Sequence, residues 1–195
     1  MLATYTSRPL LLARDLNQDR RADLVVVRGT YPTFELILFE GRADGTLVRR
    51  REFTPLIPSC SPTGIVAEDL NSDGLVDMAV SCLNMRDGVI SVIGSGNFSF
   101  YRGYTASFGA QGGQLAARDL DGDGFPELLM ASPEHHAVCV LPSWGHGQFG
   151  ISSCFGTLNT PHDLALLDVD HDGVPEVLTG GGFLPSSGTT LLRIR

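Results

Sequence analysis

The chain has 195 residues, of which 43% are hydrophobic, and its formal net charge at pH 7 is −8. This composition is typical of a folded globular domain, and it includes no apolar run of the roughly 18 residues that a transmembrane helix needs. The arginines are mostly scattered, so we expect no nucleic-acid binding, and the lack of a long apolar run predicts no membrane insertion. The N-terminal residues also lack the basic and apolar segments of a signal peptide.

One acidic segment occurs four times along the chain, at intervals of 54, 50 and 49 residues. The four copies are DLNQDRRAD from Asp15, DLNSDGLVD from Asp69, DLDGDGFPE from Asp119 and DVDHDGVPE from Asp168. A period of about 50 residues that extends over a whole chain is typical of a repeat protein. We therefore treat the chain as four copies of one structural unit.

Each copy contains short runs rich in Val, Ile, Leu and Phe, bounded by Gly, Pro, Asn or Asp. Such runs predict β-strands, and no window has the sustained 3.6-residue period of a helix. In chain order the predicted strands are 10–16, 22–27, 34–40 and 46–53; 64–70, 76–81, 88–94 and 97–104; 114–120, 126–131, 136–142 and 148–155; and 163–169, 175–180 and 189–195. The predicted fold is all-β: a β-propeller of four four-stranded antiparallel blades.

The fourth copy lacks one strand, and residues 1–7 (MLATYTS) resemble the fourth strand of a preceding copy. We expect this N-terminal strand to complete the last blade and close the ring, which removes exposed sheet edges. Residues 1–195 would then form a single propeller domain, with blades at about 8–57, 58–109, 110–158, and 159–195 plus 1–7. The alternative is a homodimer in which two chains exchange strands to form an eight-bladed ring.

Numbered from its first aspartate, each acidic segment follows the pattern D-x-[DN]-x-D-G-x-x-[DE], with Arg20 replacing the glycine in the first copy. Positions one, three, five and nine offer side-chain oxygens, and position seven can offer its backbone carbonyl. Calcium takes about six to eight oxygen ligands of this kind, and a cation would relieve repulsion among the carboxylates. The predicted ligands, for up to four Ca²⁺ ions with one per blade, are Asp15, Asn17, Asp19, Arg21 and Asp23; Asp69, Asn71, Asp73, Leu75 and Asp77; Asp119, Asp121, Asp123, Phe125 and Glu127; and Asp168, Asp170, Asp172, Val174 and Glu176.

An EF-hand loop begins in a similar way, but it needs an acidic residue at position twelve and flanking helices. Position twelve is Val26, Val80, Met130 or Thr179 in the four copies, each within a predicted strand. We therefore exclude an EF-hand.

The chain has four cysteines, and none form the CxxC pair of a zinc site. Two disulfides are expected. Cys139 and Cys154 flank a predicted hairpin turn, which would leave Cys60 to pair with Cys82. Free buried cysteines are the alternative.

The four loops resemble the FG-GAP/VCBS repeats of the integrin alpha-subunit propeller and of many exported bacterial proteins. Phe108-Gly109 and Phe155-Gly156 match the FG pair that precedes a blade, whereas the first two blades lack it. The resemblance implies Ca²⁺ in the turn between the first two strands of each blade, and a location outside the cell or at its surface. It differs in blade number, since such propellers usually have seven.

We expect a non-catalytic, calcium-binding propeller that serves as an extracellular binding, adhesion or scaffold module for a protein or glycan. A lectin-like carbohydrate binder is the alternative, with Tyr101, Tyr104 or Trp144 lining pockets between blades. A hydrolase or lyase is a third hypothesis that no motif supports, because the chain has neither GxSxG nor HExxH. The sequence GHGQFG at 145–150 lies between two predicted strands, so it predicts a hairpin turn and no dinucleotide site.

Overall fold

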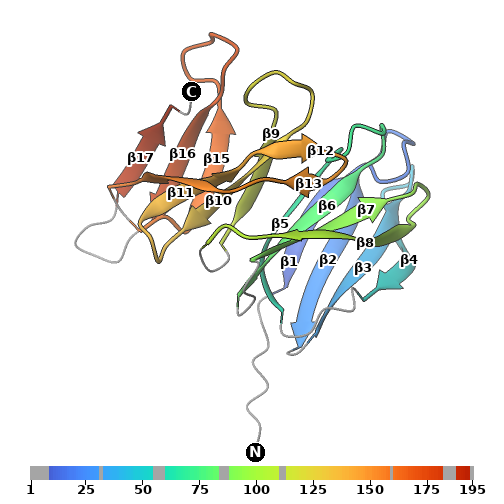
Figure 1. Ribbon diagram of the computed structural model, residues 1–195. Helices are drawn as coiled ribbons and strands as arrows, with labels where there is room; N and C mark the ends of the chain where they lie inside the picture. The colour runs from blue at the N-terminus through green and yellow to red at the C-terminus, as the bar shows by residue number, and fades with distance from the viewer. Residues whose placement is uncertain are drawn as a thin grey trace, which may run out of the picture.

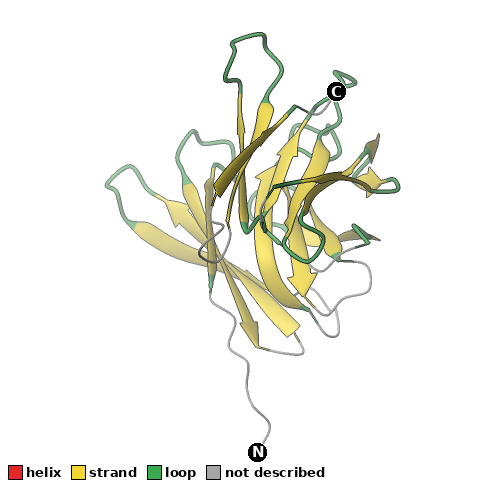
Figure 2. Cartoon of the chain, turned by 90° about the vertical axis from the view of Figure 1, so that its left-hand side faces the viewer, coloured by secondary structure: helices red, strands yellow, loops and turns green. Residues whose placement is uncertain are grey.

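The computed structural model describes residues 9–30, 33–54, 60–83, 88–109, 113–158, 160–181 and 188–193. These residues form strands, turns and loops (Figure 1; Figure 2). They include no helix, and hence none that is long and apolar enough to cross a membrane.

The described strands form five antiparallel sheets, of which four are blades and one is a small two-stranded hairpin. The first contains β1 (Leu10–Arg14), β2 (Asp23–Thr30), β3 (Thr33–Gly41) and β4 (Leu47–Phe53), and the second contains β5 (Ser61–Glu68), β6 (Asp77–Leu83), β7 (Val89–Gly94) and β8 (Phe100–Ala106). The third contains β9 (Leu115–Arg118), β10 (Glu127–Ser132), β11 (Ala137–Leu141) and β14 (Ser153–Gly156), and the fourth contains β15 (Asp163–Leu167), β16 (Glu176–Gly181) and β17 (Gly188–Leu192). Each sheet follows chain order from its inner to its outer strand.

The sheets succeed one another around a common axis like the blades of a four-bladed β-propeller, with β1–β4 and β15–β17 at the two ends of the series (Figure 1). Their first strands contact one another in the order β1, β5, β9 and β15. The predicted all-β propeller fold is therefore confirmed. Residues 1–7, which we expected to close the last blade, lie outside the described residues.

The core of the protein lies between successive blades. The largest cluster joins the first blade to the second and includes Val25, Leu38, Met78 and Ile90, each with no exposed side-chain surface. Two further clusters join the second blade to the third and the third to the fourth. Because side chains alternate between the two faces of a strand, each middle blade contributes to two clusters.

Both predicted disulfides are present. Cys60 bonds to Cys82, buried in the first core cluster, and Cys139 bonds to Cys154 across the paired strands β11 and β14. No described cysteine is free.

One strand prediction is wrong. We expected 148–155 to be a single outer strand, but β13 (Gln148–Phe149) pairs instead with β12 (Ser143–Gly145) in a separate small hairpin. The outer strand begins at Ser153, because Cys154 lies directly opposite Cys139 and the disulfide fixes that register. The third blade thus carries an added hairpin between its third and fourth strands.

Candidate metal centres

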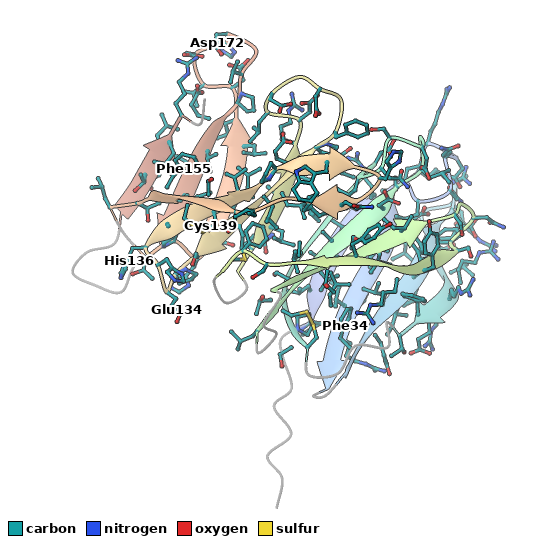
Figure 3. All side chains as sticks on the ribbon, in the orientation of Figure 1. Phe34, Glu134, His136, Cys139, Phe155 and Asp172 are labelled. Carbon is teal, nitrogen blue, oxygen red and sulfur yellow. A yellow bond between two sulfur atoms is a disulfide. The ribbon has the colours of Figure 1, made fainter. Side chains whose placement is uncertain are left out.

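The four acidic loops join the first strand of each blade to the second, so all four lie at one end of the blades. Figure 3 shows Asp172 of the fourth loop at the top of the molecule, whereas Glu134 and His136 lie at the opposite end. A propeller therefore places the candidate ligands of all blades on one face.

The first aspartate of each loop holds the turn by accepting hydrogen bonds from the backbone. In the second loop, Asp69 Oδ2 accepts from the N–H of Gly74 at 2.8 Å, and the same bond at position six recurs in the other three loops at 2.7 to 3.0 Å. The residue at position six has a positive φ in every loop, 83° at Gly74 and 65° at Arg20. Arg20 therefore adopts the glycine conformation, although left-handed backbone costs a side-chain-bearing residue about 1 kcal/mol or more.

The acid at position nine begins the second strand of each blade and is buried. Asp23, Asp77, Glu127 and Glu176 are 1%, 0%, 5% and 4% exposed. In the second loop, Asp77 accepts from the N–H of Leu70 at 3.0 Å and from the N–H of Gly94 at 2.7 Å. Gly41 and Ser143 take the place of Gly94 in the first and third blades.

Burial changes the acidity of these groups. Loss of solvation raises the pKa of Asp77 to about 6, against the opposing effect of its two backbone hydrogen bonds. The same cause raises the pKa of Asp23 and of Glu127. A carboxylate held in this way is stabilised in its charged form by a nearby cation.

The third and fourth loops gather their acids most closely. One oxygen from each of Asp119, Asp121 and Glu127 lies within 4.8 Å of the others, and the same holds for Asp168, Asp170 and Glu176. Oε1 of Glu176 is buried without a hydrogen-bond partner among the described residues. A donor set made only of oxygen atoms, one of them buried and without a hydrogen bond, fits a hard cation such as Ca²⁺.

In the first and second loops the residue at position three is an asparagine. Asn17 and Asn71 donate to the carboxylates of Asp19 and Asp73 at 2.9 and 3.0 Å. The structure therefore brings these predicted ligands together through a hydrogen bond. The N–H at position seven of every loop donates to position five, which orients that residue along the turn.

Two arginine side chains contact acids of the loops; neither ion pair was predicted, although Arg21 was predicted to offer its backbone carbonyl. Arg193, directly after β17, lies 3.0 Å from Asp170, contacts Asp172 and lies 3.7 Å from Oε1 of Glu176. Arg21 contacts Asp19 in the first loop. The strand pattern could have signalled Arg193, because a third strand ends at the loop side of its blade.

Successive loops are tied together by one recurring contact. The side chain at position four donates to the carbonyl at position six of the next loop, from Gln18 to Gly74 at 2.7 Å and from Ser72 to Gly124 at 2.8 Å. The contact links the first loop to the second and the second to the third, whereas position four of the third loop is Gly122, which has no side chain.

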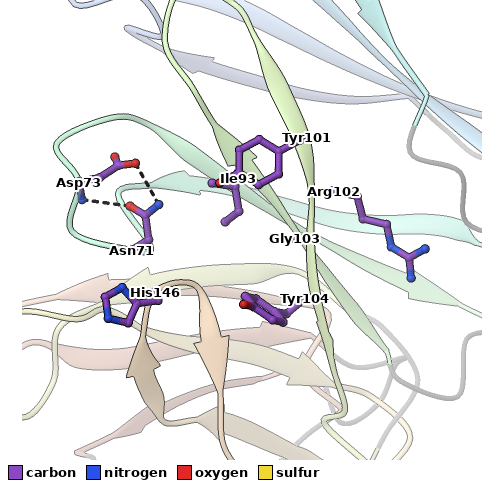
Figure 4. Close-up of a pocket in the computed structure, with 8 residues that line it drawn as sticks. All are labelled: Asn71, Asp73, Ile93, Tyr101, Arg102, Gly103, Tyr104 and His146. Atoms are coloured by element: carbon purple, nitrogen blue, oxygen red, sulfur yellow. Dashed lines mark hydrogen bonds between the residues drawn. The ribbon is translucent and has the colours of Figure 1, made fainter.

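A pocket of about 530 Å³ opens beside the second loop, between the second blade and the hairpin of the third (Figure 4). It is lined by Asn71, Asp73, Ile93, Tyr101, Arg102, Gly103, Tyr104 and His146. Tyr101 and Tyr104 are three residues apart, which in a regular strand would place them on opposite faces. A bulge in β8 opposite Ser91, whose Oγ accepts from the N–H of Tyr104 at 2.7 Å, turns both rings toward the pocket (Figure 4).

The β12–β13 hairpin fixes the other wall of the pocket. The N–H of Gly147 donates to the carbonyl of Leu70 at 3.2 Å, and the ring of His146 lies 6.4 Å from that of Phe125. Trp144, the third predicted aromatic, is 68% exposed on β12 and does not line this pocket.

Comparison with known protein families agrees with this geometry. The sequence profile of the FG-GAP-like repeat matches residues 15–80, 69–130 and 119–179. Each match begins at the first aspartate of one loop and ends in the strand that follows the next loop. A search of curated proteins found no significant match.

Proposed function

Because the chain belongs to the family of proteins built from FG-GAP-like repeats, we propose that it is a non-catalytic, calcium-stabilised β-propeller that acts outside the cell as a binding, adhesion or scaffold module. The observation that carries the proposal is the fourth loop, where three acids converge and a buried Glu176 oxygen has no hydrogen-bond partner among the described residues. We assign no catalytic residue to the chain.

Calcium would supply positive charge at the points where acids converge. In the third and fourth loops the ion would be held by Asp119, Asp121 and Glu127 and by Asp168, Asp170 and Glu176, together with the remaining predicted ligands of those loops. The turn residues hold these acids in place through their own backbone N–H groups. Since a ligand that binds only the folded chain stabilises it, bound calcium would stabilise the propeller.

The disulfides support the proposed location outside the cell, and the proposed calcium sites are compatible with it. Disulfides such as Cys60–Cys82 persist in oxidising compartments. Calcium sites on extracellular proteins can be weak, because binding there takes place at about millimolar calcium.

Calcium binding tests the proposal. The protein is first freed of metal with EDTA, and Ca²⁺ binding is then measured by titration calorimetry and by thermal melting. We expect Ca²⁺ to raise the melting temperature by several degrees, and Asp170→Asn to remove the ion of the fourth loop. Asp44→Asn is the matched control, because Asp44 lies in an exposed turn outside the loops, where it accepts from Thr46. Absence of binding heat together with an unchanged melt would refute the proposal.

A second candidate function is binding of a saccharide at the pocket beside the second loop. The observation that favours it is the bulge in β8, which places the exposed rings of Tyr101 and Tyr104 on one side, facing His146. Aromatic faces with a few oriented polar groups are the usual composition of a small-ligand site.

A glycan array with the calcium-loaded protein tests this candidate. Binding to a defined sugar that Tyr104→Ala abolishes and Trp144→Ala preserves would support it, since Trp144 is an exposed aromatic outside the pocket. Loss of binding in both variants, or no bound sugar at all, would leave the protein-binding or scaffold role as the function.

A further inference from the structure

The blades of this chain pack through the same two faces at each junction. On the face toward the preceding blade, the residue four positions before the first loop aspartate is buried, with Ile65 5% and Leu115 4% exposed. On the face toward the following blade, the residue ten positions after that aspartate is buried, with Val25, Ala79 and Leu129 each 0% exposed. These repeat positions therefore mark the two halves of a blade junction.

Among the residues that the structure describes, no blade covers the preceding face of the first blade. Leu11 is the counterpart of Ile65 and Leu115, yet it is 66% exposed. Strand register places Val26 opposite Leu11 and Leu24 opposite Ala13, and both are only half-buried. This face is thus apolar, as in the other blades, and partly open to solvent.

Within the described part of the chain, no blade covers the following face of the fourth blade either. Leu178 is the counterpart of Val25, Ala79 and Leu129, yet it is only half-buried. Leu191, which pairs with Leu178, is 51% exposed, and Leu167 at the end of β15 is 47% exposed. Among the described residues no core cluster joins this blade to the first, and Figure 1 shows β15–β17 and β1–β4 on opposite sides of the molecule.

We propose that these two faces bind each other between two copies of the chain, so that the fourth blade of each copy packs on the first blade of the other. The chain already makes this junction three times internally, and the two uncovered faces are its two missing halves. A head-to-tail contact of this kind closes when a two-fold rotation makes both junctions identical. The resulting ring has eight blades, within the size range of known propellers.

The loops supply a second contact for the same junction. Position four of the last loop is His171, whose exposed side chain can donate a hydrogen bond as Gln18 and Ser72 do. Its acceptor would be the carbonyl at position six of the first loop, Arg20 of the second copy.

The particle mass of the whole chain in solution tests the proposal. It is measured by sedimentation and by light scattering, once with calcium and once with EDTA. We expect a particle of twice the chain mass for the native protein, and a particle of one chain mass for Leu11→Glu and for Leu191→Arg. Both substituted side chains are exposed, so circular dichroism should show unchanged strand content. Ile151→Glu is the matched control, because Ile151 is 87% exposed and lies on neither face.

Mixing the two variants identifies the junction itself. An equimolar mixture of Leu11→Glu and Leu191→Arg should regain the double mass, because one junction is then native and the other pairs Glu with Arg. His171→Ala should weaken association severalfold, whereas His171→Gln, which restores the donor found in the first loop, should not. The proposal would be overturned if the native protein had the mass of one chain or formed larger open assemblies. It would also be overturned if Ile151→Glu reduced the particle mass as much as Leu11→Glu does.

Discussion

The backbone N–H of Gly94 donates to the carboxylate of Asp77 at 2.7 Å and so ties the end of β7 to the buried acid of the second loop. A Cβ atom added at Gly94 would lie 2.3 Å from the carbonyl oxygen of Val76, closer than van der Waals contact permits. We predict that Gly94→Ala lowers the free energy of unfolding by about 1–3 kcal/mol, measured by urea denaturation. Gly156→Ala is the control, since its Cβ would meet no atom within 4 Å, and an equal loss in both variants would contradict the contact.

The raised pKa of Asp77 predicts how stability depends on pH in calcium-free protein. Its pKa rises from 3.8 to about 6 on folding, so the folded state binds the proton more tightly. The protonated carboxyl therefore stabilises the folded state. This stabilisation is fully present below the pKa of Asp77 in the unfolded chain, and it is lost as the pH rises through about 6. In EDTA the melting temperature should therefore increase as the pH falls from 7 to 5.

Two comparisons test that assignment. Asp77→Asn should flatten the slope in EDTA, whereas Asp44→Asn, in an exposed turn, should keep it. Saturating calcium should reverse the slope, because protons then compete with the metal. If the melting temperature in EDTA decreases as the pH falls from 7 to 5, groups other than Asp77 dominate the pH dependence of stability.

The guanidinium of Arg193 predicts competition at the fourth loop. It contacts three carboxylates that the loop would offer to a metal: Asp170, Asp172 and Glu176. Replacing it with methionine should tighten calcium binding at that loop by about two- to fivefold, the equivalent of an exposed ion pair. Calorimetry of Arg193→Met and of Arg49→Met, whose arginine pairs with Glu52 away from the loops, measures the difference. Weaker binding in Arg193→Met would instead show that the arginine supports the site.

The two disulfides should differ in their response to reductant. Cys60 and Cys82 are both fully buried, whereas Cys154 is exposed at the outer edge of the third blade. The rate of thiol–disulfide exchange depends on how easily the reductant reaches the sulfur atoms. Mild reductant should therefore reduce Cys139–Cys154 before Cys60–Cys82. Alkylation and mass spectrometry report the order, and early labelling of Cys60 would contradict it. Removing the buried pair by a double change to alanine should cost about 2–4 kcal/mol of stability.

The sequence predicted those features that recur with the period of the repeat. Aspartates in register every fifty or so residues located all four loops, and alternating apolar runs located the strands that the loops join. The cysteine pairs followed from their positions around one hairpin turn. These signals are local, so they could be read without knowing the packing.

Features that depend on contacts between distant residues could not be predicted. The bulge in β8 opposite Ser91 turns Tyr104 beside Tyr101, and only the pairing of β7 with β8 reveals it. Arg193 reaches the fourth loop because β17 ends there, and Leu11 is uncovered because no described blade packs on it. The bulge and the uncovered face leave no pattern in the chain alone, whereas the end of the third strand of the last blade could have signalled Arg193.

Counting the calcium ions bound by the metal-free protein tests the central claim most directly. Titration calorimetry at low ionic strength should give at least two ions per chain, with the third and fourth loops filled, and Asp121→Asn and Asp170→Asn should each remove one. A chain that binds no calcium, and whose melting temperature is the same in calcium and in EDTA, would contradict the account.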